Sequence, residues 1–244
     1  MRESESATWG LRAMLEVQNV DVYYGSSQVI FGASLHVAER EPVCVLGKNG
    51  VGKTTLLRSV IGLTPPKQGS VSLDGESLIG HKPYEIAARG VAYVPQGNQL
   101  FPDLTVEQNL LLAVRRRDVL SARSQEIFRY FPGLEDKWRV RAGTLSGGQQ
   151  KFLVIARGLI IKPRVLLLDE PSEGIQPNVV QELARIIRAI AMDQNCILLL
   201  VEQNRNLAFR VAERAYIMDR GRIVADGSPA ELEAGGVVRK YLSF

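Results

Sequence analysis

The chain has 244 residues, enough to bury a sizeable core as one large α/β domain or as a domain with a subdomain. Its 45% hydrophobic and 23% charged residues are typical of a globular protein, and a net charge of +4 without a long basic run does not indicate a nucleic-acid-binding surface. No apolar run approaches the roughly 20 residues that cross a bilayer. We expect Arg115–Arg117, the densest basic cluster, to face solvent or a partner, and Cys44 and Cys196, which lie in apolar runs, to be buried thiols.

The beginning of the chain predicts an arm followed by two strands. Residues 1–13 have mixed charge and lack the apolar region of a signal peptide, so we expect a flexible arm. Apolar and polar residues alternate from Leu15 to Val22, which predicts a strand. A second strand is expected from about Ala33 to Val37.

The next stretch has the order strand, glycine-rich loop, helix. Val43–Leu46 predicts a buried strand, Gly47–Thr55 fits the spacing G-x-x-x-x-G-K-[ST], and apolar residues at helical spacing follow. Such a loop turns successive backbone N–H groups toward phosphate oxygens, and the helix N-terminus adds its dipole. We expect Lys53 to reach the β- and γ-phosphates and Thr54 to hold Mg²⁺. A plain glycine-rich turn, the alternative, does not account for both the spacing and its flanks.

The middle of the chain predicts two short strands and then helices. Residues 69–73 predict a strand that turns at Asp74-Gly75, and Val91–Val94 predicts another strand that leads to Gln96. From about 97 to 143 the pattern is typical of helices with loops, and Thr105 is placed to cap a helix. This stretch is interpreted as a helical insertion in an α/β chain.

The second half alternates helices with buried strands. In chain order we expect a long helix that opens at Leu145–Gln150 and reaches about Leu159, a strand at 165–168, a helix over 179–190, a strand at 196–201, and a hairpin at 215–225. Short apolar strands that alternate with helices predict a parallel sheet covered on both faces.

Two carboxylates, Asp169 and Glu170, follow the strand at 165–168. Open α/β sheets bind ligands at the carboxyl ends of their strands. We expect Asp169 to act on Mg²⁺, directly or through water, and Glu170 to orient and activate an attacking water. The alternative for one carboxylate is a simple acidic cap of the strand.

From Met14 onward these motifs together resemble the ATP-binding cassette ATPases. Gly47–Thr55 resembles their Walker A motif, Val165–Glu170 their Walker B motif with its catalytic glutamate, and Leu145–Gln149 their signature motif. Gln96 is similar to the glutamine that contacts Mg²⁺ and a membrane partner, and Tyr24 fits the aromatic residue that stacks on adenine. The resemblance implies an α/β fold with a P-loop NTPase core, made of a mostly parallel sheet, an antiparallel β subdomain and a helical subdomain inserted at about 97–160. It implies one domain over 14–244.

The resemblance also implies an ATPase that uses ATP and Mg²⁺ and works as a head-to-tail dimer, either with itself or with a second cassette subunit. Ser146 and Gly148 would then contact the γ-phosphate of the partner's ATP, helped by the helix dipole. The implied residues are Lys53, Glu170 and Gln203 for catalysis; Tyr24, Gly47, Lys48, Asn49, Gly50, Val51, Gly52, Lys53, Thr54, Thr55 and Gln96 for the nucleotide; Thr54, Gln96 and Asp169 for the metal ion; and Ser146, Gly147, Gly148 and Gln149 for the partner's ATP.

Two positions depart from the usual family pattern. Gln203 stands where a histidine is usual, and glutamine can hydrogen-bond a γ-phosphate but cannot carry a positive charge, which leaves the hydrolysis rate open. Gln176 stands where an aspartate is usual. Both departures resemble the second ATPase of branched-chain amino acid-type importers. Within that branch Asn49–Thr55 and Glu170–Pro177 are most similar to the urea and short-chain-amide importers, and Tyr93–Gly97, Phe101-Pro102 and Leu104–Glu107 indicate the same. Amino-acid importers of this branch tend to carry Glu at the position of Gln96.

The resemblance therefore implies an ATPase that energises uptake of urea or a short-chain amide from the cytoplasmic face of the bacterial inner membrane. Its partners would be membrane permease subunits and, indirectly, an extracytoplasmic solute-binding protein, with no nucleic acid. Branched-chain amino acid uptake is the alternative within the class. A soluble cassette ATPase acting on DNA, the ribosome or iron–sulfur assembly is an alternative of another class, and a single cassette without a coiled-coil arm argues against it. A regulator with little hydrolysis, suggested by Gln203, is opposed by the pair Asp169 and Glu170.

Overall fold

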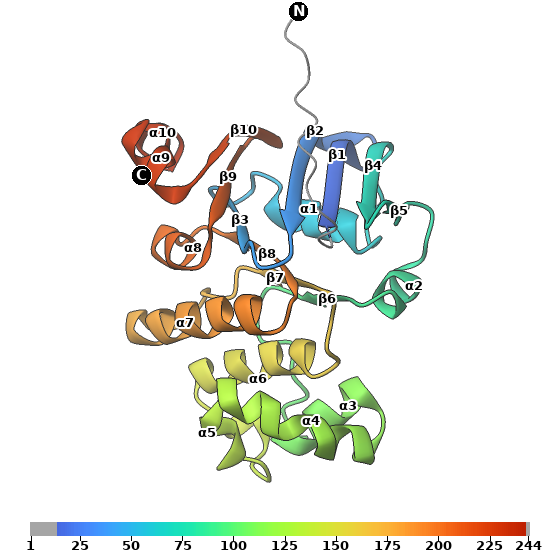
Figure 1. Cartoon of the computed structure of the whole chain (residues 1–244), viewed down its shortest axis with the longest axis vertical. Helices are drawn as coiled ribbons and strands as arrows, with labels where there is room; N and C mark the ends of the chain where they lie inside the picture. The colour runs from blue at the N-terminus through green and yellow to red at the C-terminus, as the bar shows by residue number, and fades with distance from the viewer. Residues whose placement is uncertain (1–13, 243–244) are drawn as a thin grey trace, which may run out of the picture.

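The computed structural model describes residues 14–242, so the arm expected at 1–13 lies outside the described residues. A small antiparallel sheet in the order β2-β1-β4-β5 forms one side of the molecule (Figure 1). Its strands are β1 (Met14–Tyr24), β2 (Ser27–Ala38), β4 (Gln68–Leu73) and β5 (Glu76–Ser77). The second strand starts earlier than predicted, because β1 and β2 form a hairpin that pairs as far as Tyr24 with Ser27.

A larger sheet has the order β10-β9-β3-β8-β7-β6. All neighbouring strands in it are parallel except β10, which pairs antiparallel with β9 as the predicted hairpin. These two sheets confirm the predicted combination of a mostly parallel sheet with an antiparallel β part. The strands are β3 (Val43–Leu46), β6 (Val91–Val94), β7 (Val165–Asp169), β8 (Ile197–Glu202), β9 (Arg214–Asp219) and β10 (Arg222–Gly227).

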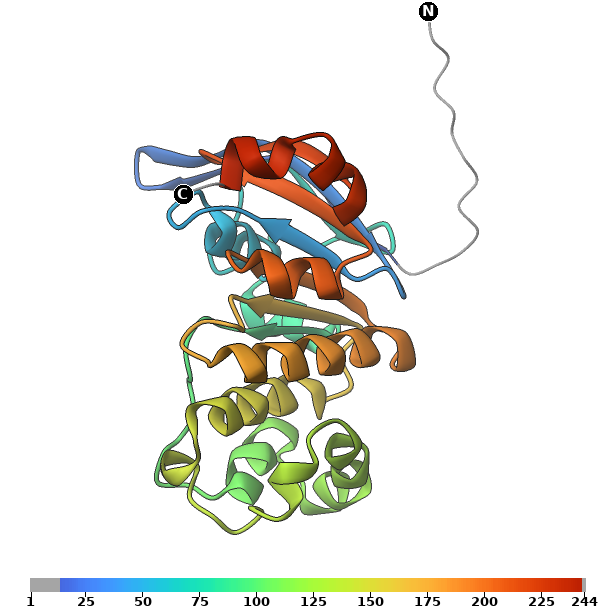
Figure 2. The same cartoon turned by 90° about the vertical axis from the view of Figure 1, so that its left-hand side faces the viewer.

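Buried strands of the large sheet send alternate side chains into two cores. On β7, Val165 and Leu167 pack in the core that holds α1 (Lys53–Val60), whereas Leu166 and Leu168 pack in the core on the opposite face. The first core lies between the two sheets (Figure 2). The second is covered by three helices, α6 (Gly147–Leu159), α7 (Pro177–Asp193) and α8 (Arg205–Val211). With both faces covered, the carboxyl edge of the sheet is where side chains can meet a ligand.

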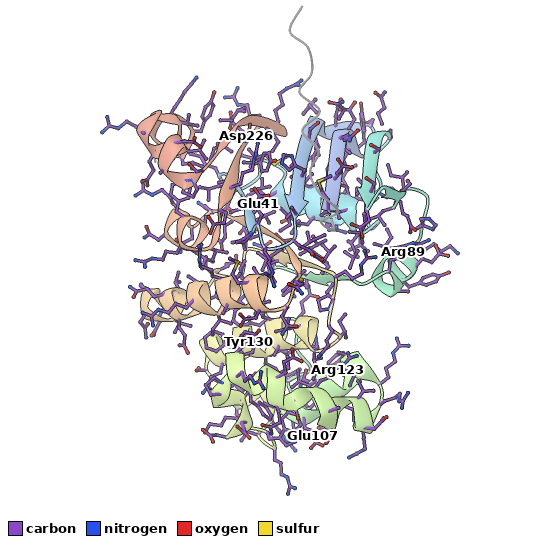
Figure 3. The ribbon with its side chains drawn as sticks, in the orientation of Figure 1. Glu41, Arg89, Glu107, Arg123, Tyr130 and Asp226 are labelled. Carbon is purple, nitrogen blue, oxygen red and sulfur yellow. The ribbon has the colours of Figure 1, made fainter. Side chains whose placement is uncertain are left out.

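A group of helices connects β6 to α6 at the far end of the molecule (Figure 1). It contains α3 (Val106–Val114), α4 (Arg117–Tyr130), α5 (Pro132–Glu135) and a 3₁₀ turn at Ala142–Thr144. Thr105 caps α3 as predicted, since its hydroxyl accepts a bond from the Gln108 N–H at 3.2 Å. Side chains of α4 tie the group to the rest, among them two labelled in Figure 3: Arg123 donates to the Ile160 carbonyl and Tyr130 to the Asp193 carboxylate. Glu126 of the same helix accepts from Lys162 and Gln194.

The remaining helices are short and lie at the periphery: α2 (Pro83–Ala88), α9 (Pro229–Ala234) and α10 (Val237–Leu242). Within residues 14–242, the structure contains no helix with the length and apolarity needed to cross a membrane. Cys44 and Cys196 are buried free thiols, as predicted. Arg115–Arg117 is exposed, which agrees with the expectation that it faces outward.

Candidate active site

The phosphate loop joins β3 to α1 in the predicted order. Gly50 and Gly52 have φ angles of 78° and 111°, in the left-handed region that favours glycine. Gly52 is the N-cap residue of α1, so the unpaired N–H groups of the first helical turn point into the loop. A loop of this kind, closed by a helix N-terminus, is a binding site for phosphate.

Segments far away in the sequence brace this loop. Gly47 N–H donates to the Glu202 carbonyl at 3.2 Å, and a Cβ on Gly47 would lie 2.6 Å from the Met218 carbonyl oxygen. Gly221, in the turn between β9 and β10, donates to the Val51 carbonyl at 2.8 Å and accepts from Phe31 N–H at 2.9 Å. The close approach of Met218 excludes a side chain at position 47, and the turn at Gly221 holds the loop from the other side.

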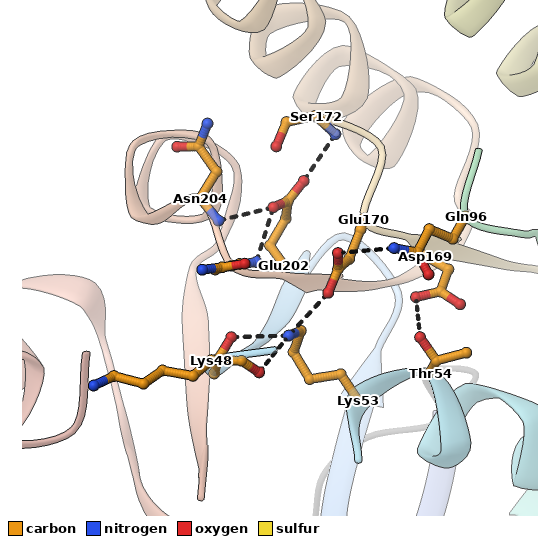
Figure 4. A network of polar contacts seen from close by, with 11 residues as sticks. Lys48, Lys53, Thr54, Gln96, Asp169, Glu170, Ser172, Glu202 and Asn204 are labelled. Atoms are coloured by element: carbon orange, nitrogen blue, oxygen red, sulfur yellow. Dashed lines mark hydrogen bonds and ion pairs between the residues drawn. The ribbon is translucent and has the colours of Figure 1, made fainter. Parts of the chain in front are cut away.

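Lys53 is a buried cation, only 3% exposed. Its Nζ donates to the carbonyls of Gly47 and Lys48 at 2.8 and 2.9 Å and lies 2.9 Å from Glu170 Oε1 (Figure 4). The three donors of the ammonium group thus have three partners. Two of these partners are backbone groups of the phosphate loop, so the charge is held at the loop itself.

Asp169 accepts one hydrogen bond on each carboxylate oxygen. Thr54 Oγ1 donates to Oδ1 at 3.0 Å, and the Tyr93 hydroxyl donates to Oδ2 at 2.8 Å. Burial raises the pKa of Asp169, and the bonds from Tyr93 and Thr54 partly offset this by lowering it. Burial, with the nearby Asp169 charge, also raises the pKa of Tyr93, which stays a hydroxyl donor. A hydroxyl beside a carboxylate suits Mg²⁺, which prefers oxygen ligands and takes its other ligands from phosphate and water.

Glu170 turns away from the strand that precedes it. Its φ of 44° is unusual for a residue with a side chain, and its N–H still pairs with the Val201 carbonyl at 2.9 Å. The carboxylate contacts Lys53 through Oε1 and accepts from Gln96 Nε2 at 3.3 Å through Oε2. The backbone conformation therefore aims the side chain at the phosphate loop on one side and at Gln96 on the other (Figure 4).

Glu202 ends β8 beside this group and is 1% exposed. Its Oε1 accepts from Ser172 N–H, and its Oε2 accepts from the N–H groups of Gln203 and Asn204, each at 2.9 Å. Burial raises the pKa of Glu202, and the bonds from the backbone partly offset this by lowering it. Gln203 is half-buried and follows directly at the same edge.

The remaining predicted residues lie beside this cluster or away from it. Tyr24 ends β1 and is 45% exposed; burial raises its pKa, but hydrogen bonds with the side chains of Thr55 and Thr64 lower it overall, so Tyr24 lies beside the phosphate loop. Ser146 caps α6: its hydroxyl accepts from Gln149 N–H at 3.3 Å, and Gln149 Oε1 accepts from Ser146 N–H at 3.1 Å. Ser146 and Gly147 are exposed and do not contact the side chains of Lys53, Thr54 or Asp169. One chain thus brings together Lys53 with Thr54 and the two carboxylates, but not the signature motif.

Comparison with protein families matches residues 30–173, more than half of the chain, to the ABC transporter family. The chain belongs to this family. Three relatives of this ABC protein match along nearly their whole length. BraG of Pseudomonas aeruginosa, a high-affinity branched-chain amino acid transport ATP-binding protein, is 38% identical over 93% of this chain and 97% of its own. LivF of Archaeoglobus fulgidus, a probable branched-chain amino acid transport ATP-binding protein, is 33% identical over 90% and 94%, and LptB of Escherichia coli, from a lipopolysaccharide export system, is 35% identical over 94% and 97%.

Solved structures show the same ABC ATPase fold. The ADP conformation of MJ1267, an ATP-binding cassette of an ABC transporter, has a TM-score of 0.83 at 22% identity and covers 93% of this chain and 97% of its own. CbiO1 of Clostridium perfringens, part of the transporter complex cbiONQ, has a TM-score of 0.83 at 24% identity and covers 94% of each chain. This ABC chain is therefore an ATP-binding subunit of the ABC transporter class, with ATPase activity.

Two residues of the site had no role in the sequence analysis. Tyr93 was predicted only as part of a strand, although β6 pairs with β7 so that Tyr93 lies opposite Leu167, close to Asp169. Glu202 directly follows the strand predicted at 196–201 and was given no role of its own. A signal for Glu202 was available in the sequence, because this carboxylate follows a buried strand, as Asp169 does. Parallel neighbouring strands end at the same edge of a sheet, so two such carboxylates lie close together.

Proposed function

We propose that this chain hydrolyses ATP with Glu170 as the residue that orients and activates water, and with Lys53 as the cation that binds the β- and γ-phosphates. The observation that carries this proposal is the contact of Lys53 with both the loop carbonyls and Glu170. An arriving phosphate competes with Glu170 for the Lys53 ammonium. Glu170 is then released beside the phosphate, where a base is needed.

The other residues of the site position the nucleotide. The N–H groups of the loop from Gly47 to Thr55 would hold the phosphates, and Tyr24 would stack on the adenine. Thr54, Asp169 and Gln96 would hold Mg²⁺, which when bound neutralises charge on the phosphate oxygens. The amide of Gln203 would hydrogen-bond the γ-phosphate without adding a positive charge.

The signature residues serve a partner subunit in this proposal. Ser146–Gln149 forms an exposed helix N-terminus that is not used by the phosphate loop of its own chain. A head-to-tail dimer, with a second copy or with a second cassette subunit, would place this N-terminus against the partner's γ-phosphate. The dimer would act on membrane permease subunits at the cytoplasmic face of the inner membrane, supplied by an extracytoplasmic solute-binding protein.

We propose import of a small solute of the branched-chain amino acid type as the transport function. The similarity to BraG and LivF along nearly the whole chain supports it. Uptake of urea or a short-chain amide is the second candidate, and Gln96 favours it because the sequence resemblance places Glu there in amino-acid importers. In this chain Gln96 donates to Glu170, a contact that an ionised Glu at the same position cannot make.

Uptake in the native cell distinguishes the two solutes. Deletion of the gene for this chain is expected to abolish most uptake of radiolabelled leucine and to leave urea uptake unchanged. Complementation with the intact chain should restore uptake, whereas complementation with the Glu170→Gln variant should not. Loss of urea uptake with normal leucine uptake would replace the first candidate by the second, and normal uptake of both would contradict both candidates.

Tyr93→Phe is expected to lower the ATPase rate about 3- to 10-fold, because Asp169 loses one hydrogen bond worth about 1 kcal/mol while the ring still fills its place. The same variant should need a higher Mg²⁺ concentration for half-maximal activity, since Asp169 is proposed to hold the ion. Titration of the purified chain with Mg²⁺ measures both. Tyr84→Phe, at an exposed position of α2, is the matched control, and an unchanged Mg²⁺ titration for Tyr93→Phe would show that Tyr93 does not orient Asp169.

A further inference from the structure

Glu202 connects three loops at the carboxyl edge of the large sheet (Figure 4). Its carboxylate holds Ser172, in the loop that follows β7, and Gln203 and Asn204, in the loop that follows β8. Its backbone carbonyl holds Gly47, the first residue of the phosphate loop. Because β3, β8 and β7 are neighbours in the sheet, one residue at the end of the central strand can reach all three loops.

The carboxylate of Glu202 is held by backbone N–H groups. Glu202 is almost fully buried, and among residues 14–242 its carboxylate forms no ion pair with Lys, Arg or His. Three N–H groups from two loops converge on its two oxygens instead. Such N–H groups stabilise a buried negative charge. Asn204 extends the arrangement by capping α8, since its Oδ1 accepts from the N–H groups of Asn206 and Leu207.

We infer that Glu202 is a positioning residue that sets the place of Gln203 relative to Glu170. Ser172 is two residues beyond Glu170, and Gln203 is next to Glu202 itself, so one carboxylate fixes the spacing between the two loops. The Glu202 carboxylate bonds to backbone N–H groups, so it acts through the backbone of Gln203 and through Ser172. The inference rests on the proposed ATP hydrolysis and on the proposed role of Gln203, and it does not depend on the transported solute.

A carboxylate is the side chain that this position requires. Both of its oxygens are acceptors, so it can serve N–H groups on two sides at once. A glutamine of the same shape has one acceptor and one NH₂ group. Whichever way the amide is turned, its NH₂ group faces either the Ser172 N–H or the pair from Gln203 and Asn204, and one loop loses its anchor.

Glu202→Gln is therefore expected to lower kcat for ATP about 10- to 100-fold, the loss typical of a misplaced catalytic group, with KM changed about twofold or less. Steady-state ATPase assays of the purified full chain measure both constants. Glu76→Gln, at an exposed position of β5, is the matched control and should have the kcat of the wild-type protein. A kcat for Glu202→Gln equal to that of the control would overturn the inference.

A double variant separates positioning from a general structural role. If Glu202 acts through Gln203, Glu202→Gln should lose most of its effect on kcat in a Gln203→Ala background, because the group that it positions is already gone. Fully multiplicative losses, or a Gln203→Ala variant with normal kcat, would overturn the inference. If Glu202→Gln does not fold, Glu202→Asp is used in the same cycle; it keeps the charge but is one methylene shorter, and a purely electrostatic role predicts normal kcat for it.

These outcomes are distinct from failure of the proposed function. A wrong solute assignment changes the uptake experiment and leaves the ATPase cycle of the purified chain untouched. If the Glu170→Gln variant hydrolyses ATP normally, the proposed catalytic role of Glu170 fails. If Glu202→Gln lowers kcat by the same factor with and without Gln203→Ala, only the positioning role of Glu202 is contradicted.

Discussion

Replacement of Glu170 by glutamine is expected to lower the rate of ATP hydrolysis at least about 100-fold and to leave ATP binding intact, because loss of a general base typically costs 10²- to 10⁴-fold. Glutamine has the shape of the glutamate, and its amide oxygen can still accept from Lys53 Nζ, which lies 2.9 Å from Glu170 Oε1. What it cannot do is take a proton from water. Bound ATP should then persist, and a head-to-tail dimer should accumulate.

Three measurements check this expectation: phosphate release for the rate, calorimetry for ATP affinity, and size-exclusion chromatography with ATP for the dimer. Glu173→Gln is the matched control, because Glu173 is exposed and lies in the same loop, three residues further on. A Glu170→Gln rate close to that of the control would remove Glu170 from the catalytic step. The expected loss of rate without a dimer would leave the base in place and contradict a dimer of two copies of this chain, so that a second cassette subunit would be the partner.

Lys53→Ala is expected to weaken ATP binding about 10- to 150-fold, since a charge-assisted hydrogen bond contributes about 1.5–3 kcal/mol. The variant also leaves the Glu170 carboxylate without its cation and the carbonyls of Gly47 and Lys48 without a shared donor. Removal of one partner of a buried ion pair is strongly destabilising. We therefore expect a lower melting temperature in the absence of ATP as well as weaker binding.

A second substitution separates these two effects. In the variant Lys53→Ala with Glu170→Gln, no unpaired charge remains, so the melting temperature should recover part of its loss while ATP affinity stays low. Calorimetry and thermal unfolding measure the two quantities, and Lys137→Ala, at an exposed position, is the control. An ATP affinity for Lys53→Ala equal to that of the control would contradict phosphate binding by Lys53, and a double variant less stable than Lys53→Ala would contradict the role of the ion pair in stability.

Local sequence order predicts much of the fold and part of the site. The strand before Gly47, the helix after it and the cap at Thr105 each depend on residues within one turn or one strand, and the structure places them as predicted. The strand ending at Asp169 was predicted for the same reason. The start of β2 at Ser27 was missed, by contrast, because Gly32, with a φ of 61°, interrupts the strand where its register with β1 shifts.

Contacts between strands could not be predicted in this way. That Tyr93 lies opposite Leu167 depends on the register of two strands that are far apart in the sequence. The contact between Lys53 and Glu170 depends on two loops and on the positive φ of Glu170. A single sequence contains the residues but not the register. The signature motif was predicted from family resemblance, and its distance from the phosphate loop of its own chain is a property of the fold alone.

The hydrogen bond from Gly221 to Val51 joins the phosphate loop to a turn that the ribosome makes much later. Val51 is synthesised long before the glycine that donates to its carbonyl. At about 5–20 residues per second, the interval is on the order of 10 to 30 s. During that time the nascent loop lacks the N–H group of Gly221 that braces it. The phosphate loop therefore reaches its fully braced form only after the β9–β10 hairpin, and with it nearly all of the core, has been made.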